Sequence, residues 1–87
     1  MAYRIFYKKS VQRDLKRLGR NEAARILDAI DKNLSTKPDS FEALSGKFSG
    51  LRKLRVGDYR VVFVLLDGEV LVLRVGHRRE VYRQREH

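Results

Sequence analysis

This chain of 87 residues contains no cysteine and no tryptophan, and it has only two histidines and one proline. Without cysteine it can form neither disulfides nor thiolate metal sites, and two histidines fall far short of a zinc ligand set. We therefore expect no metal and no cofactor, and a reducing, cytoplasmic location fits. No run approaches the ~18 apolar residues of a membrane span, and the start of the chain lacks the features of a signal peptide.

Acidic residues are scarce relative to basic ones. Twenty Lys and Arg stand against eleven Asp and Glu, which gives a formal net charge of +9. Such a charge favours association with nucleic acid, acidic protein or anionic membrane, although a merely solvated surface would have the same composition. The length suits a single domain over residues 1–87 with one modest core.

The first half of the chain has the spacing of one strand and two helices. Residues 3–7 are aromatic and β-branched, which predicts a short strand. Residues 10–18 and 21–34 carry apolar side chains at helical intervals, with Ser10 and Asn21 as the expected N-caps. The two helices therefore form a hairpin with one apolar face to bury against a sheet.

The second half of the chain has the period of β-strands. Residues 39–50 hold Phe41, Leu44 and Phe48, and we interpret them as an ordered connection to strands at 51–56, 59–66 and 69–75. The two-residue turns Gly57-Asp58 and Asp67-Gly68 predict tight hairpins. The expected fold is therefore α+β: an N-terminal strand, a two-helix hairpin, a three-stranded antiparallel meander in one sheet, and a short C-terminal segment.

Tight turns also fix the strand register. The second turn pairs Leu66 with Glu69 and, further along, Arg60 with Val75; the first turn places Arg55 opposite Arg60. One face then has Arg52 and Arg74 near its margin and otherwise carries apolar residues: Leu54, Val56, Tyr59, Val61, Phe63, Leu65, Val70 and Val72. The other face carries cations and a second apolar set: Lys53, Arg55, Arg60, Val62, Val64, Leu71, Leu73 and Val75.

Basic side chains converge at one end of this second face. Arg55 and Arg60 would have Cβ atoms about 5 Å apart, and the turn after Val75 can bring His77, Arg78 or both over the same patch. A single exposed arginine is most simply a solvated one, here partly neutralised by nearby acids. For the set taken together we favour a binding site, because clustered cations are explained by a polyanion such as RNA.

An apolar strip lies on the same face. It consists of Val62, Val64, Leu71 and Leu73, and an exposed strip of this kind is typical of a protein-binding surface. The alternative is that the connection or the C-terminal tail folds over it. The residues favour the two interpretations about equally.

The segments 51–63 and 75–82, read together, resemble the RelE-type toxins of the RelE/ParE superfamily of toxin–antitoxin modules, and the similarity covers essentially the whole chain. The resemblance implies the RelE-like fold and a metal-independent endoribonuclease, an mRNA interferase. Such a toxin cleaves translated mRNA in the A site of the 70S ribosome. The expected partners are thus mRNA, the ribosome and a RelB-like antitoxin that holds the toxin inactive.

The resemblance also implies roles for individual residues. Lys53 is the candidate for activating the 2′-OH, Arg60 for charge stabilisation, and Arg78 for stabilisation or leaving-group protonation. Tyr82 is the candidate for stacking or orienting a base; the alternative is that this aromatic packs in the core, and only its placement near the arginines favours RNA contact. His77 is chemically suited to acid–base work but ranks below Lys53 and Arg60. Further RNA or phosphate contacts are expected from Arg52, Arg55, Arg79 and Arg83.

One departure from the family concerns residue 51. Some relatives carry a lysine there, whereas this chain has Leu51, which puts rate and substrate positioning in question.

Two other functions fit parts of the pattern. A ParE-like toxin would share the fold but inhibit DNA gyrase, and a non-catalytic RNA-binding module would use the same cations without cutting. ParE-type chains generally lack Lys53, Arg60, Arg78 and Tyr82 in combination, which favours the nuclease.

Overall fold

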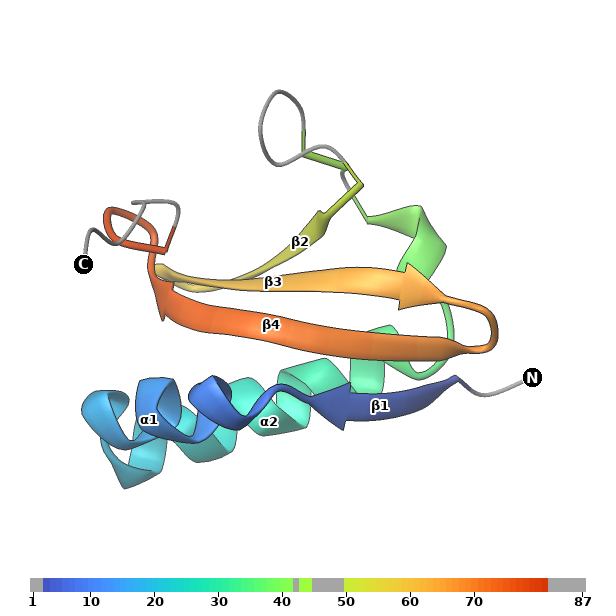
Figure 1. Cartoon of the computed structure of the whole chain (residues 1–87). Coiled ribbons are helices and arrows are strands. Elements are labelled where there is room, and N and C mark those ends of the chain that lie inside the picture. Colours follow the sequence, from blue (N-terminus) through green and yellow to red (C-terminus); the bar gives the residue numbers. More distant parts are fainter. Residues whose placement is uncertain (1–2, 42, 45–49, 82–87) are drawn as a thin grey trace.

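The computed structural model describes residues 3–41, 43–44 and 50–81. Along the chain the elements are β1 (Arg4–Tyr7), α1 (Lys9–Leu18), α2 (Arg20–Leu34), the 3₁₀ helix η1 (Pro38–Ser40), β2 (Arg52–Val56), β3 (Tyr59–Leu66) and β4 (Glu69–His77). The strands form one sheet in the order β1-β4-β3-β2, in which β1 is parallel to β4 (Figure 1). The expected α+β arrangement is confirmed.

The starts of both helices differ slightly from the prediction. α1 begins at Lys9, one residue before Ser10, and Ser10 is not the N-cap. The reason is that the backbone N–H of Lys8 still donates to the carbonyl of Val72 (2.9 Å), so the chain is extended up to Lys8 and the helix follows at once. Gly19, with φ 88°, both ends α1 and precedes α2, so Asn21 lies inside the second helix.

The two hairpins form at the predicted turns. Gly57 and Gly68 have φ angles of 60° and 72°, in the left-handed region that these tight turns require. The predicted β2–β3 register is confirmed, with Arg55 opposite Arg60. None of the helices in the described part of the chain is long and apolar enough to cross a membrane.

The β3–β4 pairing departs from the prediction at a β-bulge. The predicted register holds from the turn to the pair Phe63–Val72, after which Val62 pairs with Arg74 and Arg60 with Gly76. The expected pair of Arg60 with Val75 is therefore wrong, because Leu73 is an extra residue in β4. Alternation did not indicate the bulge, since residues of these strands are apolar on both faces and fit either register.

The bulge exchanges the faces predicted for two neighbouring residues. Val75 was expected on the cationic face but is buried in the core, where it is 4% exposed. Arg74 was expected near the margin of the core face, yet its pairing with Val62 places it on the opposite face. The structure thus adds one arginine to the cationic face.

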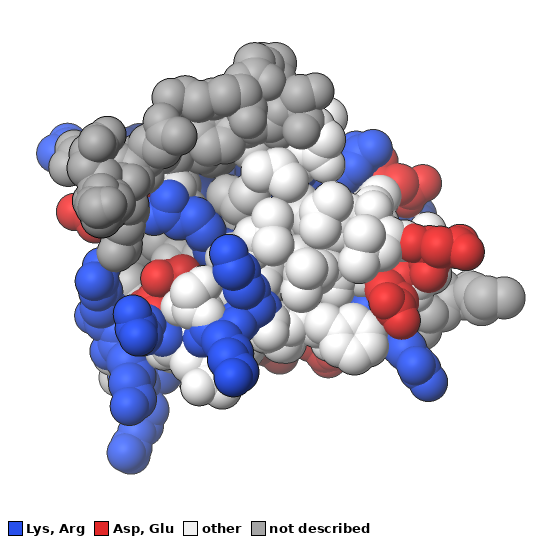
Figure 2. Space-filling model, in the orientation of Figure 1, with Lys and Arg blue, Asp and Glu red and all other residues white. Residues whose placement is uncertain are grey.

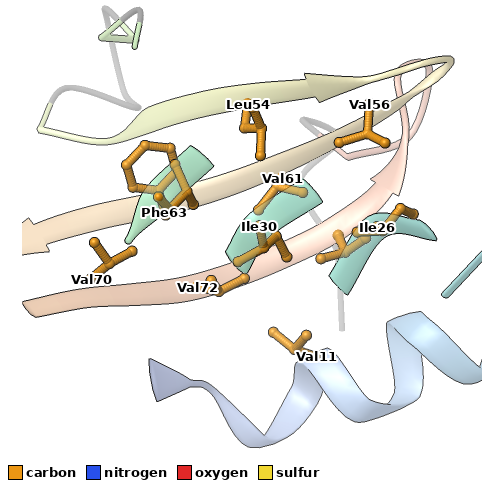
Figure 3. Close-up of a cluster of buried hydrophobic side chains, with 11 residues drawn as sticks. Val11, Ile26, Ile30, Leu54, Val56, Val61, Phe63, Val70 and Val72 are labelled. Atoms are coloured by element: carbon orange, nitrogen blue, oxygen red, sulfur yellow. The ribbon is translucent and has the colours of Figure 1, made fainter. Parts of the chain in front are cut away.

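The two helices cover one face of the sheet, and the core lies between the helices and that face (Figure 3). The buried helical residues Val11, Ile26, Ile30 and Leu34 meet strand residues that point inward: Leu54, Val56, Val61, Phe63, Val70, Val72 and Val75. Leu27, which follows the same helical spacing, is 37% exposed. We call the sheet face turned away from the helices the outer face.

The connection before β2 contributes to the core. The ring of Phe41 packs edge-on against Phe63, with centroids 6.4 Å apart, and the backbone N–H of Leu44 donates to the carbonyl of Leu51. For Phe41 this confirms the interpretation of an ordered connection. Phe48 lies outside the described residues.

Candidate functional site

The two basic motifs meet at one end of the sheet. Strand pairing sets Tyr59 beside His77 and Arg60 beside Gly76. The backbone N–H of Arg78 then donates to the carbonyl of Asp58 (2.8 Å), which ties the chain after β4 to the β2–β3 turn. Figure 1 shows this turn and the end of β4 side by side.

Four cationic residues occupy outer-face positions near this end. Arg55 and Arg60 lie opposite each other, and Lys53, Val62 and Arg74 form the next cross-strand row. Neighbouring strands are about 4.8 Å apart, so Lys53 and Arg74 have Cα atoms roughly 10 Å apart across Val62. We call Lys53, Arg55, Arg60 and Arg74 the cation cluster.

One acidic residue of the outer face lies far from the cation cluster. Glu69, an outer-face position, pairs with Leu66 at the β3–β4 turn and with Arg4 of β1, at the far end of β4 from the cluster. In Figure 2 blue atoms predominate at the left of the view and red ones at the right, with some of each colour at the other end. The balance of charge therefore changes along the strands.

Arg60 is held by the turn that precedes it. Its Nη1 donates to the carbonyls of Gly57 (3.0 Å) and Tyr59 (2.9 Å), and its side chain is half-buried. Two bonds to one terminal nitrogen fix the orientation of the guanidinium plane. A cation fixed in this way binds an anion with a smaller loss of conformational entropy than a mobile one.

The turn after β4 presents Arg78 and Arg79. The carbonyl of His77 accepts hydrogen bonds from the N–H groups of Glu80 (2.8 Å) and Val81 (2.9 Å), and both arginines are exposed. Arg78 therefore has a fixed backbone and a side chain in solvent beside the β2–β3 turn. The backbone of Arg78 thus lies next to the turn that joins the strands of Arg55 and Arg60, and its role in the site stays a prediction.

His77 is not brought to the cation cluster. It pairs with Tyr59 and faces the helical side of the sheet, where the two rings meet edge-on with centroids 6.0 Å apart. Its Nδ1 accepts a hydrogen bond from the backbone N–H of Arg79 (3.2 Å). The ring thus supports the turn that carries Arg78 and Arg79.

Arg52 is likewise engaged on the helical side. Its Nη1 donates to the carbonyls of Phe41 (2.7 Å) and Asp39 (3.2 Å), so it holds the connection against β2. The structure does not place it with the other cations. Tyr82 and Arg83 lie outside the described residues.

The apolar strip adjoins the cation cluster. Val62 is 3% exposed, whereas Val64, Leu71 and Leu73 are half-buried, and the white surface in the middle of Figure 2 lies over β3 and β4. Val81, which is 1% exposed, belongs to the same side: a Cβ built on Gly76 would lie 3.6 Å from the Cβ of Val81. The chain after β4 thus turns over the outer face at Gly76.

A shallow hollow lies beside β2, the last strand in the order of the sheet. Its volume is about 230 Å³, and it is lined by Phe41, Lys53, Leu54 and Arg55. Among residues 3–41, 43–44 and 50–81, no three His, Cys, Asp or Glu side chains lie close enough together to hold a metal ion. The chemistry available on the outer face of this part is that of fixed positive charges beside an apolar surface.

The chain belongs to the ParE toxin family of type II toxin–antitoxin systems, whose family model matches residues 3–82. The fold agrees with the toxin–antitoxin complex RelBE2 of Mycobacterium tuberculosis, at a TM-score of 0.84 and 26% identity over 92% of this chain and 95% of that one. No curated protein is similar enough in sequence to count as a match. This protein is therefore a toxin of the RelE/ParE type.

Two more distant structures share the fold alone. An arginine-to-alanine double mutant of the E. coli toxin RelE in the free state has a TM-score of 0.70 and 22% identity, covering 88% of this chain and 84% of that one. The chromosomal ParDE system of P. aeruginosa has a TM-score of 0.69 and 16% identity, covering 87% and 96%. Structural similarity thus extends to both RelE and ParE toxins.

Sequence reasoning missed two residues near this site. Arg74 joins the cation cluster through the bulge, which left no signal in the alternation. Asp14 of α1 accepts a hydrogen bond from the backbone N–H of Val75 (3.0 Å), next to the bulge. The one signal for Asp14 was its position as the single acidic residue of a basic helix.

Proposed function

We propose that this toxin is an endoribonuclease that cleaves translated mRNA in the ribosomal A site. The observation that carries the proposal is the cation cluster, in which Arg55 and Arg60 are directly opposed, together with Arg78, whose backbone is tied to the adjoining turn. Opposed like charges destabilise a sheet. A polyanionic substrate relieves that repulsion, and RNA supplies a phosphate at every nucleotide.

RNA cleavage by the neighbouring 2′-OH requires three things. The 2′-oxygen must lose its proton, the pentacoordinate phosphorane must be stabilised, and the 5′-oxygen must leave and gain a proton. The bond from the 2′-oxygen to phosphorus forms as the bond to the 5′-oxygen breaks. The products are a 2′,3′-cyclic phosphate and a 5′-hydroxyl end.

The cluster supplies positive charge where these steps develop negative charge. In the proposal Lys53 activates the 2′-oxygen by stabilising its developing negative charge while its proton passes to a water molecule, and Arg60, fixed by its bonds to two turn carbonyls, stabilises the phosphorane. Arg78 stabilises the leaving 5′-oxygen as charge develops on it. That oxygen takes its proton from water, because a guanidinium is too weak an acid to give up its own. Tyr82 orients a base, and Arg55 and Arg79 contact flanking phosphates.

The position of His77 argues against a role in proton transfer. Its ring contacts Tyr59 on the helical side, and Nδ1 accepts a backbone hydrogen bond. We therefore assign it to supporting the turn.

Inhibition of DNA gyrase is the second candidate function. It is favoured by one observation, namely that the matching family model is that of ParE toxins. A gyrase inhibitor would arrest growth without cutting RNA and would block supercoiling in a purified reaction. The two functions therefore give opposite results in the experiment below.

The proposal is tested by primer extension on a reporter mRNA after brief induction of the toxin. We expect cuts within the translated region for the wild type and for Lys32→Gln, which removes a charge from the helical side. Arg78→Ala should give no cuts, because it removes an exposed guanidinium and leaves the backbone bond to Asp58 in place. Growth arrest without cuts, together with inhibited supercoiling, would replace the nuclease with the gyrase inhibitor.

We further propose that the apolar strip binds a RelB-like antitoxin. Three of its four residues are half-buried and lie beside the cluster, so a protein that covers the strip also blocks access to the cations. RelBE2 of M. tuberculosis is itself a toxin–antitoxin complex.

Val64→Glu should therefore abolish co-purification of the co-expressed antitoxin, because it sets an unpaired charge in the apolar contact. Leu27→Glu is the matched control, since Leu27 is an exposed apolar residue on a helix. The proposal is wrong if folded Val64→Glu retains the antitoxin as well as the control does.

A further inference from the structure

β1 pairs with only the first half of β4. β1 pairs with β4 only as far as Tyr7 and Val72, and the last ladder bond runs from the N–H of Lys8 to the carbonyl of Val72. Beyond that point α1, rather than a strand, packs beside β4. The backbone groups of β4 on this side therefore need partners from the helix.

Asp14 is such a partner. Its Oδ2 accepts a hydrogen bond from the N–H of Val75 at 3.0 Å, in place of the carbonyl that a longer β1 would offer. Val75 is 4% exposed, and an unsatisfied N–H at a buried position carries a large desolvation penalty. A carboxylate acceptor makes the bond charge-assisted and therefore stronger than a neutral one.

This bond acts directly on the bulge. The N–H of Val75 belongs to the peptide group that joins Arg74 to Val75, so fixing it fixes the orientation of that peptide. Arg74 follows the extra residue Leu73, and its pairing with Val62 places it on the outer face in the row of Lys53. In the register without the bulge, Arg74 would pair with Val61 and face the helices.

We propose that Arg74 binds a phosphate of the RNA substrate and that Asp14, through its hydrogen bond to Val75, is the residue that positions Arg74 for this contact. The inference rests on the proposed ribonuclease function. In it the bulge widens the cation cluster by a third strand, so the cationic surface extends across β2, β3 and β4. Asp14 touches no substrate; it acts through β4.

The contact of Arg74 is tested by the salt dependence of RNA binding. The probe is a short single-stranded RNA with 2′-O-methyl groups, which binds but is not cleaved. Loss of one phosphate contact should make the slope of log K against log salt less negative by about 0.7, which is about a fourfold loss of affinity at physiological salt. We expect this for Arg74→Gln, wild-type behaviour for Arg74→Lys, and an unchanged slope for the control Lys32→Gln.

The positioning role of Asp14 is tested by a double-mutant cycle. Asp14→Ala should make the slope of log K against log salt less negative, as Arg74→Gln does, and it should have no further effect in the Arg74→Gln background. Asp14→Asn keeps a carbonyl acceptor and should retain most of the affinity. A general structural role would instead weaken binding equally in both backgrounds, which would overturn the assignment.

Amide hydrogen exchange provides a readout that needs no RNA. The N–H of Val75 should exchange faster in folded Asp14→Ala than in the wild type, while core amides of β3 stay protected. Unchanged exchange at Val75 would refute the positioning role. Wild-type RNA binding with no effect of Arg74→Gln overturns the inference alone, whereas a wild type that neither binds nor cuts RNA overturns the proposed function with it.

Discussion

Substitution of Arg60 should affect the rate of cleavage far more than the stability of the fold. In Arg60→Ala the protein loses two hydrogen bonds, from Nη1 to the carbonyls of Gly57 and Tyr59. Each contributes about 0.5–1.5 kcal/mol net, and the freed carbonyls can bond to water at this half-exposed site. The same substitution relieves the repulsion from Arg55, which amounts to roughly 0.7 kcal/mol for charges about 6 Å apart in a water-like dielectric.

The relieved repulsion offsets part of the lost hydrogen bonding. The net loss of stability is then about 0.3–2.3 kcal/mol, which lowers the melting temperature by no more than about 18 °C in a domain of this size. The effect on catalysis is much larger, because removing one fixed donor to a developing oxyanion costs about 10²–10³ in rate. Arg60→Lys keeps the charge but loses the planar fork, so we expect an intermediate rate.

The assay is single-turnover cleavage of mRNA on programmed ribosomes, run beside thermal unfolding of each variant. Lys32→Gln again serves as the charge-matched control. The reasoning is refuted if Arg60→Ala cleaves within tenfold of the wild type. It is also refuted if the variant is unfolded at the assay temperature, since Arg60 would then be a structural residue.

Two further expectations concern glycines. Gly57→Ala should lower the free energy of unfolding more than Gly68→Ala does, although both glycines have a positive φ. A Cβ at Gly57 would meet the guanidinium of Arg25, whereas a Cβ at Gly68 would have none of the described atoms of other segments within 4 Å. The positive φ alone costs about 1 kcal/mol in either variant. Equal melting temperatures of Gly57→Ala and Gly68→Ala would contradict this expectation, because they would show that the Arg25 side chain moves aside without cost. Gly76→Val should reduce cleavage without removing a charge, because the larger side chain displaces Val81 and the turn that carries Arg78, while Gly76→Ala makes only an ordinary contact at 3.6 Å. Equal cleavage rates for Gly76→Val and Gly76→Ala would contradict this expectation.

Much of the fold could be predicted because local signals agree with the global arrangement. The two-residue turns fix the hairpins, and the β2–β3 register with Arg55 opposite Arg60 follows from them. The helices were placed to within a residue or two by their apolar spacing. Their starts were misplaced because β1 runs directly into α1 and Gly19 serves both helices, so no capping side chain marks the boundary.

The candidate site was harder to predict where it depends on long-range contacts. The bulge at Leu73 is stabilised by Asp14, 61 positions before Val75, and no local pattern could reveal that bond. The direction of His77 depends on the same shift, since it moves His77 opposite Tyr59. The cations brought in by the tight β2–β3 turn were correctly grouped, whereas Arg74 and Arg52 required the three-dimensional structure.

The central claim is that the cations serve cleavage by a 2′-OH, and one measurement tests it directly. Purified toxin is added to ribosomes that carry an mRNA in the A site, with or without a single 2′-deoxy nucleotide on the 5′ side of the cut. We expect cleavage of the unmodified mRNA to 2′,3′-cyclic phosphate and 5′-hydroxyl ends, and none at the deoxy position. Equal cleavage of both mRNAs, or cleavage of neither, would contradict the account.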